Sequence, residues 1–431
     1  MSNPTPTRRS FLKKASLAAA AVPVSGSVVQ LAGAVHQGGE KLKLGVVGFG
    51  GRGTGAVINA LRAHPENVLY AAGDAFADRI ELGLYEAKEN TKGVVRDEQF
   101  DVPAERRFVG LDALDHVLAS GIDAVILASP PAFRPEQIEK AVGKGLHVFA
   151  EKPVATDVAG LRRVQAACKM AREKGLTVVS GLVYRYHAGR RALVQRLQEG
   201  AVGDVLAIQG DYVTGELWSF PKAHEWTEMQ WQLRNWLYHT WLSGDLIAEQ
   251  HIHTLDMMAW IKGDTYPIAA TSLGGRQKRT GEQFGNVFDH FATVYEWEDG
   301  TRGFAYCRQQ DGCAKSVNEF VMGTEGRANV FLHTITGKNP WRHEGKVPDA
   351  YQVEMDEMFA AIRSGKRIDN GDYMCNSTMM ALMGRMAGYT GQRITREQAW
   401  NSAEVLVPDK VRFEDTPPKG VVAIPGITKF A

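Results

Sequence analysis

The chain has 431 residues, of which 44% are hydrophobic and 23% are charged, and its formal net charge is +1. This length exceeds what one hydrophobic core usually organises, so we expect two domains. The balanced charge argues against nucleic-acid binding, and the 4 cysteines lack the spacing of a structural zinc site.

The N-terminal residues are typical of an export signal. Residues 7–13 read TRRSFLK, a twin-arginine motif, and an alanine-rich segment then leads to residues 32–34 (AGA), which suit cleavage before Val35. We therefore predict that residues 1–34 are a twin-arginine signal peptide and that the protein is periplasmic or otherwise extracytoplasmic. A basic, disordered tail is the alternative. No other stretch reaches the roughly eighteen apolar residues of a membrane span, so we expect none.

A glycine motif follows the first predicted strand. Residues 41–55 read KLKLGVVGFGGRGTG, which indicates an apolar strand, a tight turn and the start of a helix. Gly48 permits the turn, Gly50 lets the backbone approach a pyrophosphate, and Gly53 lets the helix pack on the strand. Free N–H groups at the helix start would bind the phosphates. The predicted dinucleotide contacts in this motif are Gly48, Phe49, Gly50, Gly51, Arg52 and Gly53.

An acidic residue follows the next predicted strand. Residues 68–73 read VLYAAG, and Asp74 comes about twenty residues after the motif, where a carboxylate binds the ribose hydroxyls of a dinucleotide. Ala75 and Phe76 stand where a 2′-phosphate site would have a basic residue, so we predict NAD rather than NADP, although Arg79 is close in sequence. A glycine turn without a ligand is the alternative, and it leaves the position of the acid to chance.

Strand and helix patterns alternate through the rest of residues 41–183, which is typical of a parallel sheet with helices on both faces. Ligands of such sheets bind beyond the carboxyl ends of the strands. We therefore expect five residues after two of the strands to face the cofactor: Ser129 and Pro130 after residues 122–128, and Glu151, Lys152 and Pro153 after residues 146–150. The other predicted elements are strands at 106–110 and 176–181, a helix at 134–144, and a helix from the capping residue Asp157 to about residue 174.

The pattern changes near residue 184. Longer alternating strands joined by hairpin turns predict a mostly antiparallel sheet, and hence a substrate-binding and oligomerisation domain over residues 184–390. Its predicted strands are residues 207–213, 287–297, 302–308 and 319–322, with late helices at 351–364 and 376–389 that pack against either domain. Residues 391–431 are expected to be a tail. The fold class is therefore α/β, with a Rossmann domain followed by an open-sheet α/β domain.

One predicted helix carries side chains suited to proton transfer. Residues 243–263 read SGDLIAEQHIHTLDMMAWIKG and lie between capping residues and a terminal glycine, so we expect a helix of about five turns. Asp245, Glu249, His253 and Asp256 would share one stripe of this helix. Glu249 would meet His253 one turn later and orient its imidazole. An ordinary salt bridge on a solvated face is the alternative.

A second histidine in this helix raises the question of a metal site. His251 is roughly 160° around a regular helix from His253, so the two imidazoles should not bind one metal ion. We therefore predict no metal site, although a local break in the helix would reopen a Glu/His/His arrangement.

Residues 218–241 are rich in aromatic side chains and hold more than half of the 9 tryptophans. Aromatic faces beside polar groups suit sugar rings. A loop that packs its own small core, or a subunit interface, explains the pattern equally well. The predicted substrate contacts are Arg234, Asn235, Trp236 and Trp241 in this segment, Asp245 in the helix, and Tyr184 and Arg185 just past a strand end.

These motifs together resemble the glucose-fructose oxidoreductase and inositol dehydrogenase (Gfo/Idh/MocA) family. The resemblance rests on the glycine motif, on EKP at residues 151–153, and on an acid four residues before a histidine in a later helix, and it spans residues 41–391. It implies a Rossmann domain plus an open-sheet domain, a carbohydrate substrate, and a homodimer or homotetramer. It also implies that Lys152 lies near the nicotinamide, that Pro153 follows a cis peptide bond, and that His253 is the catalytic histidine.

Three positions depart from the usual pattern of this family. Glu249 stands where an aspartate is more common, His251 where members often have a glycine, and Arg134 where many have a histidine. The identity of the substrate therefore cannot be taken from the resemblance.

The leading hypothesis is a nicotinamide-dependent oxidoreductase in which His253 removes the proton of a sugar or polyol hydroxyl and Lys152 holds that hydroxyl. Outside the cytoplasm a released NADH has no obvious pool for reoxidation, so we expect a tightly held, internally recycled cofactor. One alternative is an NAD-dependent glycosidase that cleaves by transient oxidation and elimination. The other is a non-catalytic sugar-binding protein on the same scaffold, which would not require Lys152 and His253 together.

Overall fold

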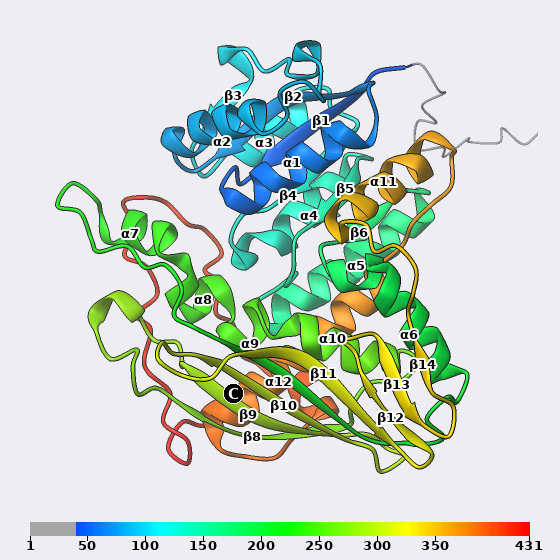
Figure 1. Ribbon diagram of the computed structural model, residues 1–431. Helices are drawn as coiled ribbons and strands as arrows, with labels where there is room; N and C mark the ends of the chain where they lie inside the picture. Colours follow the sequence, from blue (N-terminus) through cyan, green and yellow to red (C-terminus); the bar gives the residue numbers. More distant parts are fainter. Residues whose placement is uncertain (1–39) are drawn as a thin grey trace, which may run out of the picture. The chain divides into compact units, whose positions relative to one another are not determined.

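The computed structural model describes residues 40–431, and its first domain is built on a parallel sheet (Figure 1). The 6 strands lie in the order β3-β2-β1-β4-β5-β6, and every neighbouring pair is parallel. They are β1 (Leu42–Val47), β2 (Asn67–Asp74), β3 (Arg107–Val109), β4 (Ala124–Leu127), β5 (His147–Ala150) and β6 (Val178–Ser180). The strand order reverses between β1 and β4, so a ligand crevice is expected beyond their carboxyl ends.

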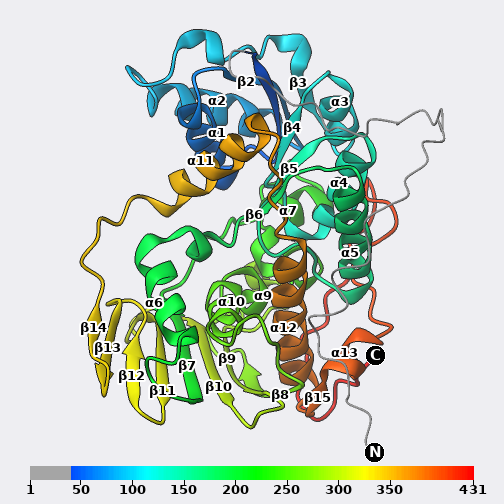
Figure 2. The ribbon, with the colours of Figure 1, turned by 90° about the vertical axis from the view of Figure 1, so that its right-hand side faces the viewer.

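Helices cover both faces of this sheet (Figure 2). One face packs against α1 (Gly51–Ala63), α2 (Ala77–Glu89) and the late helix α11 (Ala350–Arg363). The other face packs against α3 (Ala113–Ala119), α4 (Arg134–Gly143) and α5 (Val158–Glu173), which Asp157 caps as predicted. Every residue of β4 and β5 is buried because both faces are covered, which explains their continuous apolar sequence.

The second domain is built on a 9-stranded sheet in the order β14-β13-β12-β11-β7-β10-β9-β8-β15. The strands are β7 (Val205–Thr214), β8 (Ala269–Gly275), β9 (His290–Glu296), β10 (Arg302–Gln309), β11 (Ser316–Gly323), β12 (Gly326–Asn329), β13 (Thr334–Gly337), β14 (Trp341–Arg342) and β15 (Ile394–Thr395). Only β7 and β10 pair in parallel; all other neighbours are antiparallel. Burial alternates along β9, so one face of the sheet is covered and the other is open.

The helices of the second domain cover one face of this sheet. α10 (Ile252–Ile261) packs against β7, and α12 (Gly371–Thr390) packs against β8 and also against α5 of the first domain. The other helices are α6 (Ala188–Gln198), α7 (Glu228–Arg234), α8 (Thr240–Ser243), α9 (Leu246–Glu249) and α13 (Arg396–Trp400). The 3-10 turns are η2 (Asp97–Gln99), η3 (Ala104–Arg106), η4 (Pro131–Phe133), η5 (Val183–Tyr186), η6 (Trp236–Tyr238) and η7 (Glu282–Phe284). Because α12 contacts both domains, one continuous core joins them.

The predicted fold class is confirmed, together with all strands of the first sheet and the main strands of the second. The sequence reasoning missed β8, whose sequence AATSLGG is rich in small residues, and the strands β12 to β15, which are too short to show apolar alternation. β15 and α13 lie inside the segment predicted to be a tail, and regular structure ends only at Trp400. α11 follows the second sheet in sequence but joins the core of the first domain through Met355, Met358 and Phe359.

Residues 1–34, the predicted export signal, lie outside the described residues. Among the helices of residues 40–431, none combines the length and the apolar character that a membrane crossing requires. The cysteines are free thiols.

Candidate active site

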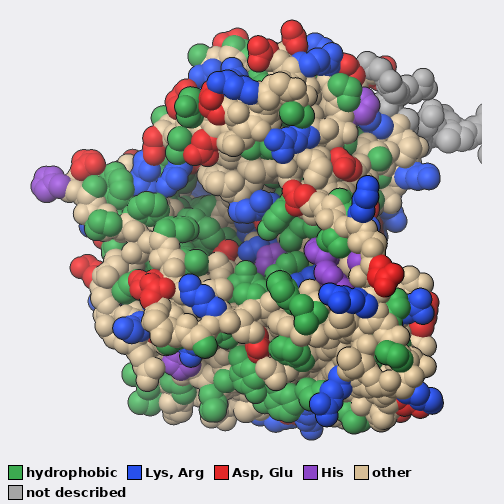
Figure 3. Space-filling model, viewed as in Figure 1, with side chains coloured by type: hydrophobic (Ala, Val, Ile, Leu, Met, Phe, Trp, Pro, Cys, Tyr) green, Lys and Arg blue, Asp and Glu red, His purple; other side chains and the backbone are tan. Residues whose placement is uncertain are grey.

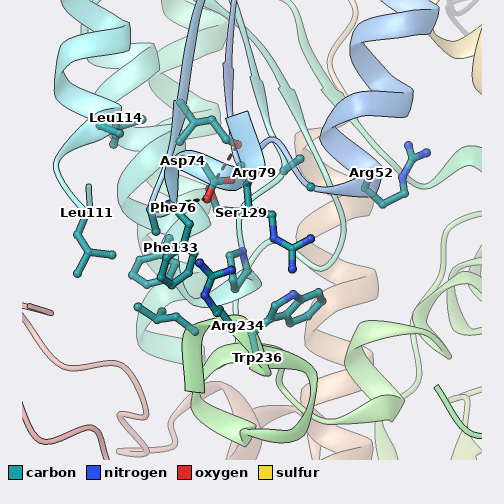
Figure 4. Close-up of a pocket in the computed structure, with 18 of the residues that line it drawn as sticks. Arg52, Asp74, Phe76, Arg79, Leu111, Leu114, Ser129, Phe133, Arg234 and Trp236 are labelled. Carbon is teal, nitrogen blue, oxygen red and sulfur yellow. Dashed lines mark hydrogen bonds between the residues drawn. The ribbon is translucent and has the colours of Figure 1, made fainter. Parts of the chain in front are cut away.

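A cavity of about 540 Å³ lies over the carboxyl ends of β1, β2 and β4 (Figure 4). Gly48 has φ +87°, a conformation that residues with side chains rarely adopt, and a Cβ there would lie 2.4 Å from the Ser129 nitrogen. A Cβ on Gly53 would lie 2.0 Å from the Gly48 carbonyl oxygen, so only glycine lets α1 approach β1 this closely. Gly50 and Gly51 line the cavity, and a Cβ on either would have no neighbour within 4 Å.

The start of α1 completes a cradle for an anion. Its first turn has no side-chain cap and no acidic residue, so its N–H groups are free to donate to a phosphate. These features fit the diphosphate of a dinucleotide, since a side chain at Gly50 would fill the space that the phosphates need. Phe49 differs from the prediction: its side chain is 1% exposed and packs on Gly83 in the domain core, and its backbone N–H donates to Asp74 instead of lining the cavity. We call this space the dinucleotide cavity.

Asp74 ends β2 and ties the glycine turn to the next loop. Its Oδ2 accepts a hydrogen bond from the Phe49 N–H at 2.7 Å, and its Oδ1 accepts one from the Phe76 N–H at 3.0 Å. Burial raises the pKa of Asp74, although the two backbone donors oppose that rise. Each carboxylate oxygen has a second lone pair, and Asp74 lines the cavity, so it can also accept from ribose hydroxyls.

Arg134 joins the loops that follow β4 and β5. Its Nη1 donates to the Pro153 carbonyl at 2.6 Å and its Nη2 to the Ser129 carbonyl at 2.8 Å. Burial lowers the pKa of Arg134 to about 10. Ser129 and Pro130 line the dinucleotide cavity, and the peptide bond between Lys152 and Pro153 is cis, as the resemblance implies. The buried guanidinium thus holds both predicted cofactor loops at one crevice.

A second cavity, of about 270 Å³, adjoins the first on the side of the sheet domain. The residues that line both cavities are Arg52, Trp218 and Trp236. Lys152, Glu249 and His253 all line the second cavity, so the lysine after β5 and the imidazole of α10 converge beside the dinucleotide cavity. Figure 3 shows the hollow between the two domains, with basic and histidine side chains inside it.

The cations of the second cavity are paired with carboxylates. Lys152 Nζ lies 3.2 Å from Glu249 Oε1, and Arg52 Nη2 lies 2.6 Å from Glu151 Oε1. The Arg52 guanidinium also lies 4.4 Å from the centroid of the Tyr351 ring. Burial alone would raise the pKa of Glu151, but Arg52 and Lys152 together lower it. Glu151 is therefore ionised and fixes Arg52 between the two cavities.

The continuous helix predicted over residues 243–263 is wrong, because the chain forms α9 and α10 with a turn between them. The His253 N–H donates to the Gln250 carbonyl, whereas a regular α-helix would use the Glu249 carbonyl. The Glu249 carbonyl is therefore free, and it accepts a hydrogen bond from Lys152 Nζ. The break in the helix thus provides a second acceptor for the lysine.

His253 is buried against two tyrosine rings. Its ring centroid lies 5.0 Å from that of Tyr184 and 6.5 Å from that of Tyr212. Burial lowers the pKa of His253 well below its usual value, and nearby cations add to the effect, so the imidazole is neutral at pH 7 and can accept a proton. Its Nδ1 has no hydrogen-bond partner among residues 40–431. The predicted contact from Glu249 to this imidazole is therefore not formed.

His251 lines neither cavity. It is fully buried, its ring lies edge-on to Tyr212 at 6.5 Å, and burial lowers its pKa to about 3. Neither ring nitrogen has a partner within the described part of the chain. Although the helix is broken, residues 40–431 contain no group of three His, Cys, Asp or Glu side chains placed to hold a metal ion.

Two acid or basic residues predicted to touch the substrate are structural instead, which corrects the prediction. Arg185 is buried and its Nη2 lies 2.8 Å from Asp256 Oδ1. Asp245 is fully buried, and it accepts from the Leu246 N–H at 2.6 Å and the Phe288 N–H at 2.9 Å. Neither residue lines a cavity, so the predicted stripe of four side chains on one helix face is not formed.

Asn235 and Trp241 also line neither cavity. The Asn235 Oδ1 accepts from the Phe220 N–H at 2.9 Å, and its Nδ2 donates to the Gln283 carbonyl at 2.6 Å. The Trp241 indole N–H donates to Gln232 Oε1 at 2.8 Å. These two residues hold the aromatic segment together, which agrees with the alternative of a loop that packs its own core.

The remaining predicted substrate residues lie at or near the cavities. Arg234 lines the dinucleotide cavity rather than the second one, and Trp236 lines both. Tyr184 packs behind His253 without lining either cavity. Three polar lining residues of the second cavity that the sequence reasoning missed are Tyr212, Gln250 and Tyr351. Side-chain alternation along β7 could have indicated Tyr212, whereas nothing near residue 351 signals that α11 reaches the site.

Two family models match the chain. Residues 42–182 match the Gfo/Idh/MocA oxidoreductase family model with an NAD-binding Rossmann fold, and residues 191–329 match the Gfo/Idh/MocA C-terminal domain. Together the two models cover more than half of the chain, and they confirm the predicted NAD-binding Rossmann domain.

Curated relatives include enzymes of two kinds. The chain is 27% identical over 202 residues to 2,7-anhydro-N-acetylneuraminate hydratase of Escherichia coli (strain K12), a match that covers 46% of this chain and 50% of that protein. The chain thus spans about half the length of that relative. It is 23% identical over 348 residues to scyllo-inositol 2-dehydrogenase (NAD(+)) of Bacillus subtilis (strain 168), which covers 76% of this chain and 87% of that protein.

A solved structure shares the fold. Scyllo-inositol dehydrogenase from Lactobacillus casei, with bound cofactor NAD(H) and scyllo-inositol, superimposes with a TM-score of 0.62 at 19% identity. The superposition covers 83% of this chain and 100% of that chain. Both domains of this protein therefore have a counterpart of known fold.

Proposed function

Because the chain belongs to the Gfo/Idh/MocA family of oxidoreductases, we propose that it acts on a hydroxyl-bearing carbon of a sugar or polyol with a tightly held NAD. The proposal depends on the convergence of Lys152, Glu249 and His253 on the cavity that adjoins the glycine turn. The glycine turn would hold the diphosphate and Asp74 the ribose. Bound NAD would supply the hydride acceptor. Sugar binding alone does not require a lysine and a neutral imidazole at this junction, which argues against the non-catalytic alternative.

Lys152 and His253 act on different atoms of the substrate hydroxyl. The neutral imidazole of His253 accepts the hydroxyl proton during oxidation and returns it during reduction. The Lys152 ammonium, held by the carbonyl and the carboxylate of Glu249, stabilises the negative charge that develops on the hydroxyl oxygen. Glu249 therefore acts through Lys152 rather than through His253, which revises the role expected from the sequence.

The charge balance of the second cavity favours a neutral substrate over a sugar acid. Each lysine and arginine that lines it, among residues 40–431, already pairs with a carboxylate. A substrate carboxylate would therefore meet no unpaired cation, whereas sugar hydroxyls can both donate to and accept from these groups. The rings of Trp218 and Trp236, with centroids 6.0 Å apart, offer apolar surfaces that suit the C–H faces of a sugar.

Absorbance of the bound nicotinamide tests the proposal. The purified protein is scanned after mixing with neutral sugars, polyols and sugar acids, and its released ligand is identified by mass spectrometry. We expect released NAD or NADH and a nicotinamide spectral change with neutral compounds. Bound dinucleotide without a spectral change for any compound would contradict the redox function, and a response confined to sugar acids would contradict the neutral substrate.

A second candidate is cleavage of a glycosidic bond through transient oxidation and elimination. The relative that is named a hydratase rather than a dehydrogenase favours it. Incubation with glycosides and no added acceptor separates the two functions. Sugar release with the bound NAD unchanged in amount supports cleavage, whereas turnover only with a carbonyl co-substrate supports the oxidoreductase.

The TRRSFLK sequence at residues 7–13 supports export by the twin-arginine route, which carries folded proteins. An enzyme exported in this way would collect its cofactor before export and recycle it in place. Fractionation of producing cells tests this: we expect a periplasmic protein that begins at Val35. Arg8→Lys with Arg9→Lys should leave the chain in the cytoplasm, and an uncleaved cytoplasmic wild type would contradict the proposal.

The open face of the second sheet supports a homodimer or homotetramer. Leu273 and Tyr306, which are 76% and 38% exposed, lie in one cross-strand row on either side of Ala292. Large apolar side chains in such a row are typical of a buried interface. Light scattering should give a multiple of the monomer mass for the wild type and a lower mass for Leu273→Glu with Tyr306→Glu. A monomeric wild type would contradict this assembly.

A further inference from the structure

The dinucleotide cavity has a floor from the first domain and a roof from the second. The floor is the glycine turn with the loops after β2 and β4. The roof comes from the aromatic segment of the second domain, whose lining residues are Trp218, Phe220, Leu233, Arg234 and Trp236. Figure 4 shows Arg234 and Trp236 on the opposite side of the cavity from Asp74. A long ligand in this cavity would therefore lie between the two domains and contact both.

One ion pair ties the roof to the floor. Arg234 ends α7, and its two terminal nitrogens donate to the two carboxylate oxygens of Asp78 on α2, at 2.9 Å and 2.7 Å. The guanidinium also lies 3.9 Å from the centroid of the Phe76 ring and 4.9 Å from that of Trp226. A bidentate pair with stacked rings is stronger than an ordinary surface salt bridge. Asp78 stands four residues past Asp74, at the ribose end of the cavity.

The C-terminal residues support this pair from behind. The Phe413 ring lies 5.7 Å from the Phe76 ring, so Phe76 has Arg234 and Phe413 as neighbours. The Phe413 carbonyl accepts a hydrogen bond from the Thr227 hydroxyl at 2.8 Å, just before α7. The segment is therefore anchored to the same part of the roof that carries Arg234.

We propose that these four residues, Arg234, Asp78, Phe76 and Phe413, form a clasp that sets how slowly the dinucleotide leaves. The inference rests on the proposed function, which requires that this cavity hold NAD. The clasp lies at the rim of the cavity, with the Asp78 side chain 59% exposed and the Arg234 side chain 15% exposed, so a substitution at Asp78 should disturb the domain cores little. Its effect should therefore appear in the rate of release rather than in the free energy of unfolding.

Release of bound NADH tests the clasp. The wild type, Asp78→Asn and Arg234→Ala are loaded with NADH and mixed with excess NAD, and the loss of bound-NADH fluorescence is followed. We expect both variants to release NADH about tenfold faster or more, because a bidentate charge-assisted pair is lost. Their thermal unfolding should stay close to that of the wild type. Glu81→Gln is the matched control, since it removes an exposed pair with Arg107 from the same helix α2 without touching the cavity.

The possible results distinguish a failure of the clasp from a failure of the proposed function. Release from both variants at the wild-type rate would overturn the clasp while leaving the proposed function intact. A wild type that exchanges NADH rapidly would contradict the captive cofactor, and the ratio of variant to wild-type rates would still decide for or against the clasp. A reversed pair, Asp78→Arg with Arg234→Asp, should restore slow release. If calorimetry shows no dinucleotide binding at all, the function and the clasp both fail.

Discussion

The two cavities share Arg52 in their walls, yet they are built in different ways. The dinucleotide cavity rests on backbone groups, glycines and a helix N-terminus at neighbouring strand ends of one sheet. The second cavity rests on charged and aromatic side chains from α1, β7, η6, α9, α10, α11 and the loops after β5 and before α7. Shape therefore decides what the first cavity binds, whereas charge pairing decides the protonation states in the second. The two should fail in different ways when they are mutated.

The strongest test removes Lys152, one of the two cations that line the second cavity. Lys152→Ala should lower kcat by about 10²- to 10⁴-fold, because the developing oxygen charge loses its partner, and bound NAD should remain. Steady-state rates and dinucleotide content are measured together. Lys144→Ala, on the exposed end of α4, is the control and should behave as the wild type. Normal turnover of Lys152→Ala would contradict a catalytic role for the second cavity.

Substitutions in the dinucleotide cavity should weaken cofactor binding rather than slow the chemical step. Gly50→Ala places a methyl group where no protein atom lies within 4 Å, so it should weaken dinucleotide affinity by about tenfold to a hundredfold with little change in stability. Gly48→Ala should lose stability as well, because φ is +87° and the Cβ would lie 2.4 Å from the Ser129 nitrogen. Calorimetric titration and urea unfolding distinguish them. Full affinity in Gly50→Ala would contradict the cradle.

The aromatic segment lines both cavities and also packs a small core of its own. A substitution at Asn235 tests the packing role alone, because this residue lines neither cavity. Asn235→Ala leaves the Phe220 N–H and the Gln283 carbonyl unpaired, so we expect a loss of about 1–3 kcal/mol in the free energy of unfolding. Chemical denaturation measures it, and the exposed Asn339→Ala is the control. A stable Asn235→Ala variant with weakened substrate binding would show that this residue contacts the substrate after all.

Of the two histidines in the broken helix, His253 lines the second cavity and His251 lies in the core. The pH dependence of stability tests the buried one. The pKa of buried His251 is lowered to about 3, so its neutral form is favoured in the folded state, and acid favours unfolding below the unfolded pKa of about 6.5. Between pH 7 and pH 5 this histidine should cost about 2 kcal/mol of stability. His251→Leu should therefore flatten the loss of stability in acid. Parallel curves for wild type and variant would show that this imidazole is not buried neutral.

Part of this protein was predictable from local sequence. The glycine turn, Asp74, the strands of the first sheet and the cap at Asp157 follow from apolar periodicity and from residues with special backbone preferences, which act over short stretches of chain. Lys152 and His253 were named as candidates for the same reason, since each belongs to a recognisable local motif.

The tertiary structure alone decided which polar side chains face a cavity. Asn235, Trp241 and Arg185 have the composition of a sugar site, but the fold uses them to pair a backbone carbonyl, a side-chain amide and a buried carboxylate, respectively. The helix expected around Glu249 is broken, and the carbonyl that the break leaves free accepts a hydrogen bond from Lys152, nearly a hundred positions earlier. A buried polar group must find a partner, and the partner comes from whichever segment packs there, which no local pattern records.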